Sequence, residues 1–458
     1  MPRRHIHWLI IVAVVSLFAS GSTDRYSHSF RFLMNEVSRR ALQPASQREL
    51  FDGSIHGMLS ELDPNSTYSP PTQYQELKKE LYQEFEGIGI KVYLDETNQR
   101  LTVGCCLPNT PVQAAGLQSG DIIQKVDGVS TENWTIAAFN KALHEHAGTS
   151  IAFEIFRPKA NQTFTASIRP QRLFAESVCG DRRKPDGSWE FFLPSPANED
   201  AKTVKKIAYV KIVAFGEKTS SEMREILKKL KAQGMSGLVI DLRGNLGGFL
   251  NSALEISDMF VKDTILVQVK GRDEEHSQTY FATPKVFCDG IPVAILIDHD
   301  TASAAEIFAA CLQDYGASAG RPIVCIGSRT YGKGTIQEII TLGPLPDDRH
   351  LEHETADTPR LWERIWDKPV RGGLKITVAE YRRPNGGKIN RDRNRDTDAD
   401  EWGVSPNPGF ESVFEDTFES FAYYQKRISG VLSPEDSCLI YDYDAPLFRA
   451  WEWFSSKK

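Results

Sequence analysis

The feature that most constrains the fold of this chain is the alternation of short apolar runs with amphipathic segments after residue 206. Four apolar runs predict buried strands: Ile207–Val213, Leu238–Leu242, Ile291–Ile297 and Pro322–Ile326. An amphipathic helix follows the first run, and Thr219 and Glu222 at its start have the spacing of a capping box. Strands that alternate with helices in this way predict an α/β core.

Length and charge indicate the number of domains and the class of partner. At 458 residues the chain exceeds one average domain, and its 40% apolar content can fill large cores. A net charge of −7 leaves no basic surface for nucleic acid. We expect a mixed multi-domain chain in six parts: an export segment at 1–22, a helical region at 26–84, a small β-barrel domain with helices at 85–170, a linker or insertion at 171–205, the α/β core at 206–410 and a C-terminal tail at 411–458.

The N-terminus has the pattern of a targeting segment. Arg3 and Arg4 precede the apolar run Trp8–Ala19, and the small residues 20–22 follow it. A basic start, a short apolar run and small residues are typical of a secretory signal peptide. No clean Ala-x-Ala site is present, so an uncleaved membrane anchor is the alternative. In either case we expect the bulk of the chain to be exported, to the periplasm or to the periplasmic face of a membrane.

Cysteines and acidic clusters predict neither a metal nor a cofactor. The seven cysteines are odd in number and lack C-x-x-C spacing: Cys105, Cys106, Cys179, Cys288, Cys311, Cys325 and Cys438. The segment 392–401 begins like a calcium loop, but Thr397 stands where the loop needs glycine and Gly403 where it needs glutamate. We expect a solvated acidic insert there.

The chain also places a serine at the start of a helix and a lysine in a later glycine-rich loop. Ser303 follows an apolar strand, and Lys333 stands between two glycines. A serine hydroxyl needs a base, and a lysine can serve once its ammonium is desolvated and its pKa falls. The pair predicts a serine hydrolase that needs no histidine. Structural roles are the alternatives: Ser303 and Glu306 match a capping box, and Lys333 suits a solvated loop.

Two other motifs are rejected on their context. Residues 327–333 match the first part of a phosphate-binding P-loop, but Gly334 replaces the magnesium ligand and a strand-like run follows instead of a helix. Ser318 lies in a G-x-S-x-G pattern, yet it follows a helix and precedes a strand, the reverse of a nucleophile elbow.

Residues 85–170 resemble a PDZ domain. The resemblance rests on the run Pro111–Gly128, with its short helix, Gly-Asp turn, strand and Asp-Gly, followed by an expected helix at Trp134–His146 and a strand at Ser150–Phe156. PDZ domains bind a peptide as an added β-strand and hold its terminal carboxylate on backbone N–H groups. The resemblance matches that loop to four residues: Gly87, Ile88, Gly89 and Ile90. A hairpin turn that needs a positive φ is the alternative.

The whole order of motifs resembles the carboxyl-terminal processing proteases (tail-specific proteases), over about residues 30–410. The matching segments are Asp52–Leu59, Leu62–Tyr68, Phe85–Val92, Ala115–Ile122, Ile240–Gly248, Ser303–Phe308, Leu312–Tyr315, Tyr331–Gln337 and Leu374–Ala379. The resemblance implies a serine–lysine dyad at Ser303 and Lys333, with Gln337 orienting the lysine. It also implies protein substrates that a PDZ domain recognises by their C-termini.

The remaining expectations concern the oxyanion hole and the departures from the family. We expect the oxyanion hole to use the N–H of Ala304 and that of Gly247 or Gly248, because glycine lets a substrate approach the backbone closely. The serine-rich run of the family reads Thr301–Ala305 here, and residues 316–321, 343–371 and 388–409 are expected as additions. A catalytically silent PDZ adaptor with a degenerate peptidase core is the alternative function.

Overall fold

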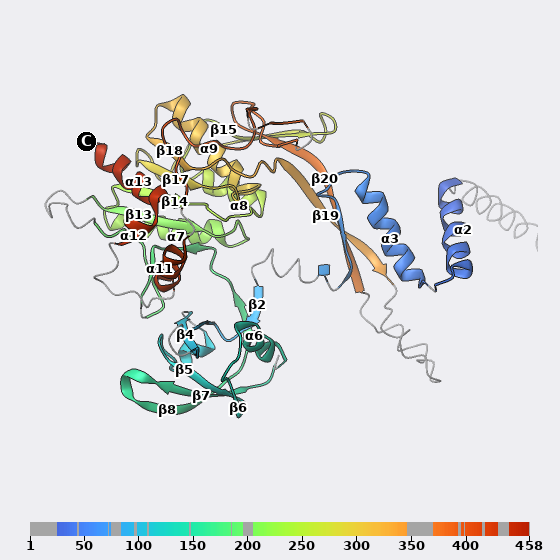
Figure 1. The fold of residues 1–458 in the computed structure, drawn as a ribbon. Helices are drawn as coiled ribbons and strands as arrows, with labels where there is room; N and C mark the ends of the chain where they lie inside the picture. Colours follow the sequence, from blue (N-terminus) through green and yellow to red (C-terminus); the bar gives the residue numbers. More distant parts are fainter. Residues whose placement is uncertain are drawn as a thin grey trace, which may run out of the picture. The chain divides into compact units, whose positions relative to one another are not determined.

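The computed structural model describes fourteen ranges: 25–43, 45–71, 73–74, 84–95, 99–107, 110–145, 148–184, 186–195, 205–345, 370–392, 395–397, 399–414, 417–428 and 439–457. The predicted export segment 1–22 and most of the addition expected at 343–371 lie outside these ranges. The chain divides into two compact units, one made of residues 1–75 and 337–377 and the other of residues 76–336 and 378–458 (Figure 1).

The first unit consists of two helices and a small sheet. Helix α2 (Arg25–Arg40) precedes α3 (Gln47–Ser60), which begins with a capping box between Ser46 and Glu49. Strand β1 (Thr67–Ser69) pairs antiparallel with the first part of β20 (Val370–Arg382), and β20 also pairs with β19 (Thr335–Leu345). A small apolar cluster of Ile55, Leu59 and Tyr68 joins α3 to β1. Within the helical region expected at 26–84, residues 44, 72 and 75–83 lie outside the described residues.

The segment that resembles a PDZ domain forms a six-stranded antiparallel sheet in the second unit. Its strands are β3 (Ile90–Leu94), β4 (Leu101–Cys106), β5 (Ile122–Val126), β6 (Val129–Ser130), β7 (Ile151–Arg157) and β8 (Gln162–Ile168). Helices α5 (Pro111–Ala114) and α6 (Ile136–Glu145) complete it, and a separate ladder joins β2 (Glu84–Gly87) to β9 (Gln171–Phe174). The order β3-β4-β5-β7-β8 leaves β3 at an edge.

The α/β core is built on a five-stranded sheet of order β10-β13-β14-β17-β18. Its strands are β10 (Val178–Cys179), β13 (Ile207–Ile212), β14 (Gly237–Asp241), β17 (Val293–Ile297) and β18 (Ile323–Gly327). The last four are parallel and lie within a residue or two of the four predicted strands. One face packs on α7 (Thr219–Ala232), α8 (Leu250–Ser257) and α9 (Ala304–Ala319). The predicted α/β core is therefore confirmed.

The C-terminal segment 411–458 was expected as a tail, but its described helices cover the other face of this sheet. Helices α11 (Phe418–Ile428), α12 (Ile440–Tyr443) and α13 (Ala445–Ser456) lie there, in red in Figure 1. Leu447, Ala450, Trp451 and Phe454 repeat at helical spacing and are buried against the strands. This periodicity was present in the sequence, and the segment belongs to the core because the sheet needs cover on both faces.

Residues 171–190, expected as part of a linker, contain strands β9 and β10 and the hairpin of β11 (Arg182–Arg183) with β12 (Trp189–Glu190). The predicted capping box at Thr219 is wrong. The Glu222 carboxylate accepts hydrogen bonds from the N–H and hydroxyl of Ser177 at 3.1 and 2.7 Å, and the Thr219 hydroxyl donates to the Ser177 hydroxyl at 2.7 Å. Glu222 therefore binds Ser177, the residue before β10, instead of capping its own helix.

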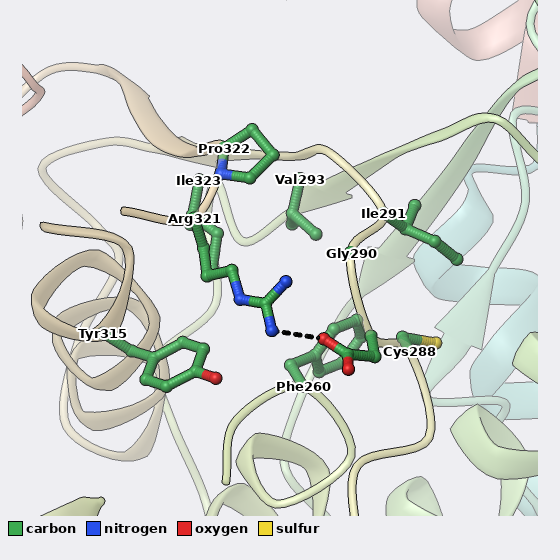
Figure 2. A pocket seen from close by; sticks show the side chains of 10 residues that line it. Phe260, Cys288, Gly290, Ile291, Val293, Tyr315, Arg321, Pro322 and Ile323 are labelled. Atoms are coloured by element: carbon green, nitrogen blue, oxygen red, sulfur yellow. Dashed lines mark ion pairs between the residues drawn. The ribbon is translucent and has the colours of Figure 1, made fainter. Parts of the chain in front are cut away.

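Strands β15 (Ile265–Gly271) and β16 (Gln278–Phe281) form an antiparallel ladder that the sequence did not predict, and β15 also pairs with residues 379–382 of β20. Of the helices that the structure describes, none is both long and apolar enough to cross a membrane. The six described cysteines are free thiols, and Cys438 lies outside the described residues. A cavity of about 10 Å³ under the Arg321–Asp289 ion pair (2.7 Å) has room for roughly one water (Figure 2).

Candidate active site

Ser303 occupies a strained turn between strand β17 and helix α9. Its φ of 58° and ψ of −119° lie in a region that residues other than glycine rarely adopt. Strain of this kind collects at functional sites, and a nucleophile on a sharp strand-to-helix turn has its hydroxyl exposed. The side chain is partly accessible, while Ala302 and Ala304 on either side are buried. The turn therefore leaves Ser303 more accessible than its two neighbours.

Glu306 joins this turn to the lysine loop. Its fully buried carboxylate accepts hydrogen bonds from the N–H of Ser303 at 2.9 Å, Gly332 at 2.8 Å and Lys333 at 2.8 Å, and from the Thr330 hydroxyl at 2.6 Å. Burial raises the pKa of Glu306, and these four hydrogen bonds oppose that rise. Since Glu306 Oε2 accepts from both Ser303 and Lys333, the two backbones lie side by side.

The lysine loop is also supported from behind by the segment 388–409. The N–H of Arg391 donates to the Gly332 carbonyl at 2.8 Å, and Asn390 Oδ1 accepts from the Gly334 N–H at 3.2 Å. A side chain at Gly332, whose φ is +83°, would lie 2.8 Å from the buried Trp402 ring. Residues 388–409 were expected as an addition, and the described residues Asn390, Arg391 and Trp402 on either side of the acidic stretch 392–401 pack against the lysine loop. Strand β19 begins at Thr335, so no helix follows Lys333 and the rejection of a P-loop is confirmed.

The glycine pair Gly247–Gly248 lies against the serine turn. A side chain at Gly247 would come within 2.7 Å of Ser303 Cβ, and one at Gly248 within 2.3 Å of the Phe215 carbonyl. The N–H of Gly247 donates to Asn245 Oδ1 at 2.8 Å. The N–H groups of Gly248 and Ala304 donate no hydrogen bond to any residue that the structure describes. The backbone donor that follows Ser303 and the one that follows Gly247 are thus both available.

Asn245 connects this glycine pair to its surroundings. Its side chain is almost fully buried, and Nδ2 donates to the Ile212 carbonyl at the end of β13 at 2.7 Å. Its own carbonyl accepts from the N–H of Ala302 at 2.9 Å, one residue before Ser303. The loop and the serine turn are therefore held in one register.

A buried charge cluster lies at the base of the loop. Arg243 donates from Nε to Asp241 Oδ1 at 3.0 Å and from Nη2 to Asp241 Oδ2 at 2.7 Å, and it binds Asp444 at 2.8 Å through both Nη atoms. Lys211 Nζ lies 3.8 Å from Asp241 and donates to the Arg243 carbonyl at 2.9 Å. Burial opposes the ionisation of Asp241, but Arg243 and Lys211 hold its pKa far below the usual range. Burial, together with the Asp241 charge, raises the pKa of Tyr209.

Gln337 belongs to the first unit. Its Nε2 donates to the Thr377 hydroxyl at 3.2 Å, which in turn donates to Asp63 Oδ1 at 3.0 Å. Burial works against ionisation of Asp63, but hydrogen bonds from Ser66, Asn65 and Thr377 outweigh it and lower its pKa. The expected role of Gln337 in orienting Lys333 stays a prediction.

The residues matched to a PDZ carboxylate loop form the turn into edge strand β3. Gly89 has a φ of +81°, and a side chain there would collide with Thr110. A positive φ is expected both for a carboxylate loop and for a hairpin turn, so it does not distinguish the two interpretations. Gly87 pairs with Gln171 in the ladder of β2 and β9. Ile88 is 1% exposed and packs in the domain core, so its side chain does not line an open pocket, whereas Ile90 is partly exposed.

The rejected motifs keep their structural roles. Ser318 lies in the last turn of α9, and its hydroxyl donates to the Tyr315 carbonyl at 3.4 Å. His299 is largely exposed beside Asp300. Asp396 pairs with Lys388 at 2.6 Å, and the described residues contain no group of His, Cys, Asp or Glu side chains that could hold a metal. Asp398 and Asn394 lie outside the described residues.

Sequence reasoning missed the residues that support the site: Lys211, Asp241, Arg243, Asn245 and Asp444. Glu306 was recognised only as a capping partner of Ser303. The i+3 spacing of Ser303 and Glu306 indicated the capping contact. No local pattern could indicate the hydrogen bonds of Glu306 to the lysine loop, which lies more than 20 residues later in the chain.

Comparison with known proteins agrees with this arrangement. Residues 206–406 match the model of peptidase family S41, and residues 75–155 match the PDZ domain model. A carboxy-terminal-processing protease of Bartonella bacilliformis is 26% identical over 386 residues, which cover 83% of this chain and 76% of that protein. Two further relatives are the carboxy-terminal processing protease CtpB of Bacillus subtilis (28% identical, 70% of this chain, 61% of that protein) and a carboxyl-terminal-processing protease of Picosynechococcus (26%, 76% and 72%).

The fold and these matches define a serine-type peptidase that carries a PDZ domain. Residues 206–406 are a peptidase S41 domain and residues 75–155 a PDZ domain, and the resemblance to carboxyl-terminal processing proteases seen in the sequence is confirmed.

Proposed function

We propose that this protein is an exported endopeptidase that cleaves protein substrates recognised near their C-termini, with Ser303 as nucleophile and Lys333 as general base. The observation that carries the proposal is the shared hydrogen bonding of Glu306, whose one carboxylate accepts the backbone N–H groups of both residues. This carboxylate fixes the position of the Ser303 backbone relative to that of Lys333.

The reaction follows from the groups at hand. The Ser303 Oγ attacks the scissile carbonyl carbon, and its proton passes to the Lys333 amine, which must be neutral to accept it. The lysine then protonates the leaving amine as the C–N bond breaks. Water, deprotonated by the same amine, hydrolyses the acyl-enzyme and restores the serine.

We assign the oxyanion hole to the N–H groups of Ala304 and Gly248. Ala304 follows Ser303 in the chain, Gly248 follows Gly247, and neither N–H donates to another described residue, whereas the Gly247 N–H already binds Asn245. Gly247 contributes in another way, because only glycine permits the observed approach to Ser303. Preorganised backbone donors of this kind stabilise the charge that develops in the transition state.

Substrate recognition is assigned to the PDZ domain. Strand β3 lies at a sheet edge and can accept a peptide as an additional strand, and the Gly89 turn stands at its beginning. A substrate that adds to β3 would be held by main-chain hydrogen bonds, and its terminal carboxylate would meet the backbone around Gly89.

Export is proposed from residues 1–22, which have the pattern of a signal peptide. Expression of the full chain, followed by cell fractionation and N-terminal sequencing of the mature protein, tests it. A cleaved N-terminus after the small residues 20–22 supports a signal peptide, a retained N-terminus in the membrane fraction supports an anchor, and a cytoplasmic full-length protein contradicts export.

The catalytic assignment is tested with purified wild type and Ser303→Ala on an unstructured peptide that ends in a free carboxylate. We expect hydrolysis and fluorophosphonate labelling by the wild type and neither by the variant, with an unchanged circular dichroism spectrum. Cleavage at equal rates would refute the nucleophile. If the wild type neither cleaves nor labels, the chain is a silent PDZ adaptor.

A further inference from the structure

Residues 243–249 contain Gly247 and Gly248 and form what we call the glycine loop. Its first residue, Arg243, is bound by Asp444 from the C-terminal part of the chain. The Arg243 guanidinium lies between two carboxylates, and Asp444 binds it at 2.8 Å through both oxygens. Paired N–H···O bonds of this kind fix the orientation of the guanidinium plane as well as its distance. The side chains of Arg243 and Asp444 are only 13% and 10% exposed, so solvent screens the contact weakly.

Asp444 is itself held rigidly. It is the N-cap of helix α13, where its Oδ1 accepts the N–H of Leu447 at 3.0 Å. Leu447 is fully buried, and α13 packs on the strands of the core sheet. Asp444 also lies outside residues 206–406, the part of the chain that matches the S41 model. The clamp is therefore contributed by a segment beyond that match.

The charge balance shows what Asp444 adds. Two cations, Lys211 and Arg243, share the carboxylate of Asp241, and Asp444 supplies the second negative charge. Without it, one buried carboxylate would face two cations, which would leave an uncompensated charge in a site of low dielectric constant. Arg243 would then turn toward solvent or toward Asp241 alone.

Any such movement reaches the glycine loop through the backbone. The Arg243 carbonyl accepts from Lys211, and the next residue, Gly244, donates its N–H to Asp298 at 3.0 Å. The N–H of Gly248 that we assign to the oxyanion hole follows four residues after Gly244. A displaced Arg243 therefore displaces a donor whose alignment matters only in the transition state.

We propose that Asp444 is a positioning residue for peptide hydrolysis. Through Arg243 it holds the glycine loop, and with it the Gly248 N–H, in register. The proposal rests on the proposed function for its catalytic consequence, whereas the anchoring of the loop is a structural claim that can be measured without catalysis. Helices α12 and α13, which meet at Asp444, then help to position the active-site backbone.

The test compares Asp444→Asn with Asp442→Asn in the full-length protein. Asparagine is as good an N-cap as aspartate, so the first variant removes the charge while it keeps the start of α13. Asp442 is an exposed acid two residues away and serves as the matched control. Hydrogen exchange followed by mass spectrometry should show faster exchange over residues 243–249 in Asp444→Asn and wild-type exchange in Asp442→Asn.

Catalysis supplies the second readout. For Asp444→Asn we expect kcat to fall by about ten- to a hundredfold with KM within about twofold, because a misaligned oxyanion donor weakens transition-state binding alone. The affinity for a peptide boronic acid, which forms a tetrahedral adduct on serine, should fall by the same factor as kcat/KM. Binding of the uncleaved peptide, measured on a Ser303→Ala background, should not change.

A third variant separates positioning from stability. Leu227→Ala leaves a cavity under α7, on the face of the sheet opposite α13, and it should lower Tm while kcat stays close to that of the wild type. Unchanged exchange over residues 243–249 in Asp444→Asn overturns the proposal, and so does a loss of activity that only follows Tm. A wild type that cleaves no peptide refutes the proposed function, while the exchange result still decides whether Asp444 anchors the loop.

Discussion

The lysine loop and the glycine loop are held in place by different kinds of electrostatic interaction. On one side, Glu306 is a buried carboxylate whose described hydrogen bonds come from three backbone N–H groups and one hydroxyl, with no cation among them. On the other side, the Arg243 cluster balances two cations against two carboxylates. The same task of fixing a loop is performed once by dipoles and once by ion pairs.

This difference teaches how each side responds to protonation and to substitution. Burial raises the pKa of Glu306, because neutral donors compensate only part of the lost hydration. Arg243 and Lys211 more than compensate for burial at Asp241 and lower its pKa. The Glu306 side is therefore the one that protonates first as pH falls, and the Arg243 side is the one that suffers most from loss of a charge.

The largest expected effect isolates chemistry from the Glu306 scaffold. Lys333→Arg keeps the backbone N–H that Glu306 accepts, but arginine cannot lose its proton in a protein and so cannot act as base. We expect it to be as inactive as Lys333→Ala in a peptide-cleavage assay, and the wild-type rate to rise with pH as the amine deprotonates. Substantial activity in the arginine variant would contradict the general-base role.

Next in size is the effect of breaking the ion cluster. Asp241→Asn leaves Arg243 and Lys211 with Asp444 alone, and loss of one partner from a buried ion pair costs about 3–5 kcal/mol of unfolding free energy. Urea unfolding measures it, with Asp300→Asn, an exposed carboxylate, as control. If Asp241→Asn lost less unfolding free energy than Glu306→Gln, the comparison would be reversed.

Glu306→Gln should cost less stability, about 1–3 kcal/mol, because it removes hydrogen-bond acceptors and no ion pair. The amide oxygen can still accept, but its NH₂ faces an N–H donor from the serine turn or the lysine loop. We expect kcat to fall much further than stability suggests. The exposed Glu338→Gln serves as control, and equal kcat in both variants would show that the turn needs no carboxylate.

The pH dependence of stability should have opposite signs on the two sides. Unfolded Glu306 ionises near pH 4.3, before the folded carboxyl does, so its contribution falls as pH rises through the interval up to the raised folded pKa. Asp241 contributes stability above about pH 3.9 that is lost as pH falls toward its lowered pKa. In urea unfolding from pH 3 to 8, the advantage of wild type over Asp241→Asn should shrink toward acid. The wild type should instead lose ground to Glu306→Gln as pH rises.

The smallest expected effect lies outside both anchors. Amidating the C-terminus of a peptide substrate removes the charge that the Gly89 turn is proposed to bind, and leaves the scissile bond unchanged. We expect KM to rise several-fold with little change in kcat, in contrast to Asp444→Asn. Calorimetry on full-length Ser303→Ala should show the weaker binding, and equal affinity for both peptides would remove the carboxylate-reading role.

Much of the fold could be predicted because its signals are local. The four parallel strands are runs of apolar residues buried on both faces, and the α9 start follows from the i+3 spacing of Ser303 and Glu306. The C-terminal helices were missed although Leu447, Ala450 and Phe454 repeat at helical spacing, since no local pattern states which surface such a face will cover. The capping box at Thr219 failed because the helix N-cap is Lys218 and the Glu222 carboxylate binds Ser177, which lies 45 residues earlier in the chain.

By itself, the sequence determined the elements and the reactive groups: an α/β core, a PDZ domain, a serine at a helix start, and a lysine and two glycines in loops. Only the tertiary structure decided which residues meet there. Glu306 accepts from the lysine loop, Asn245 accepts the Gly247 N–H, and Asp444 binds Arg243, which lies 201 residues earlier in the chain. Periodicity and turn chemistry act over a few residues, whereas these contacts depend on the order of the strands and on which helix covers each face of the sheet.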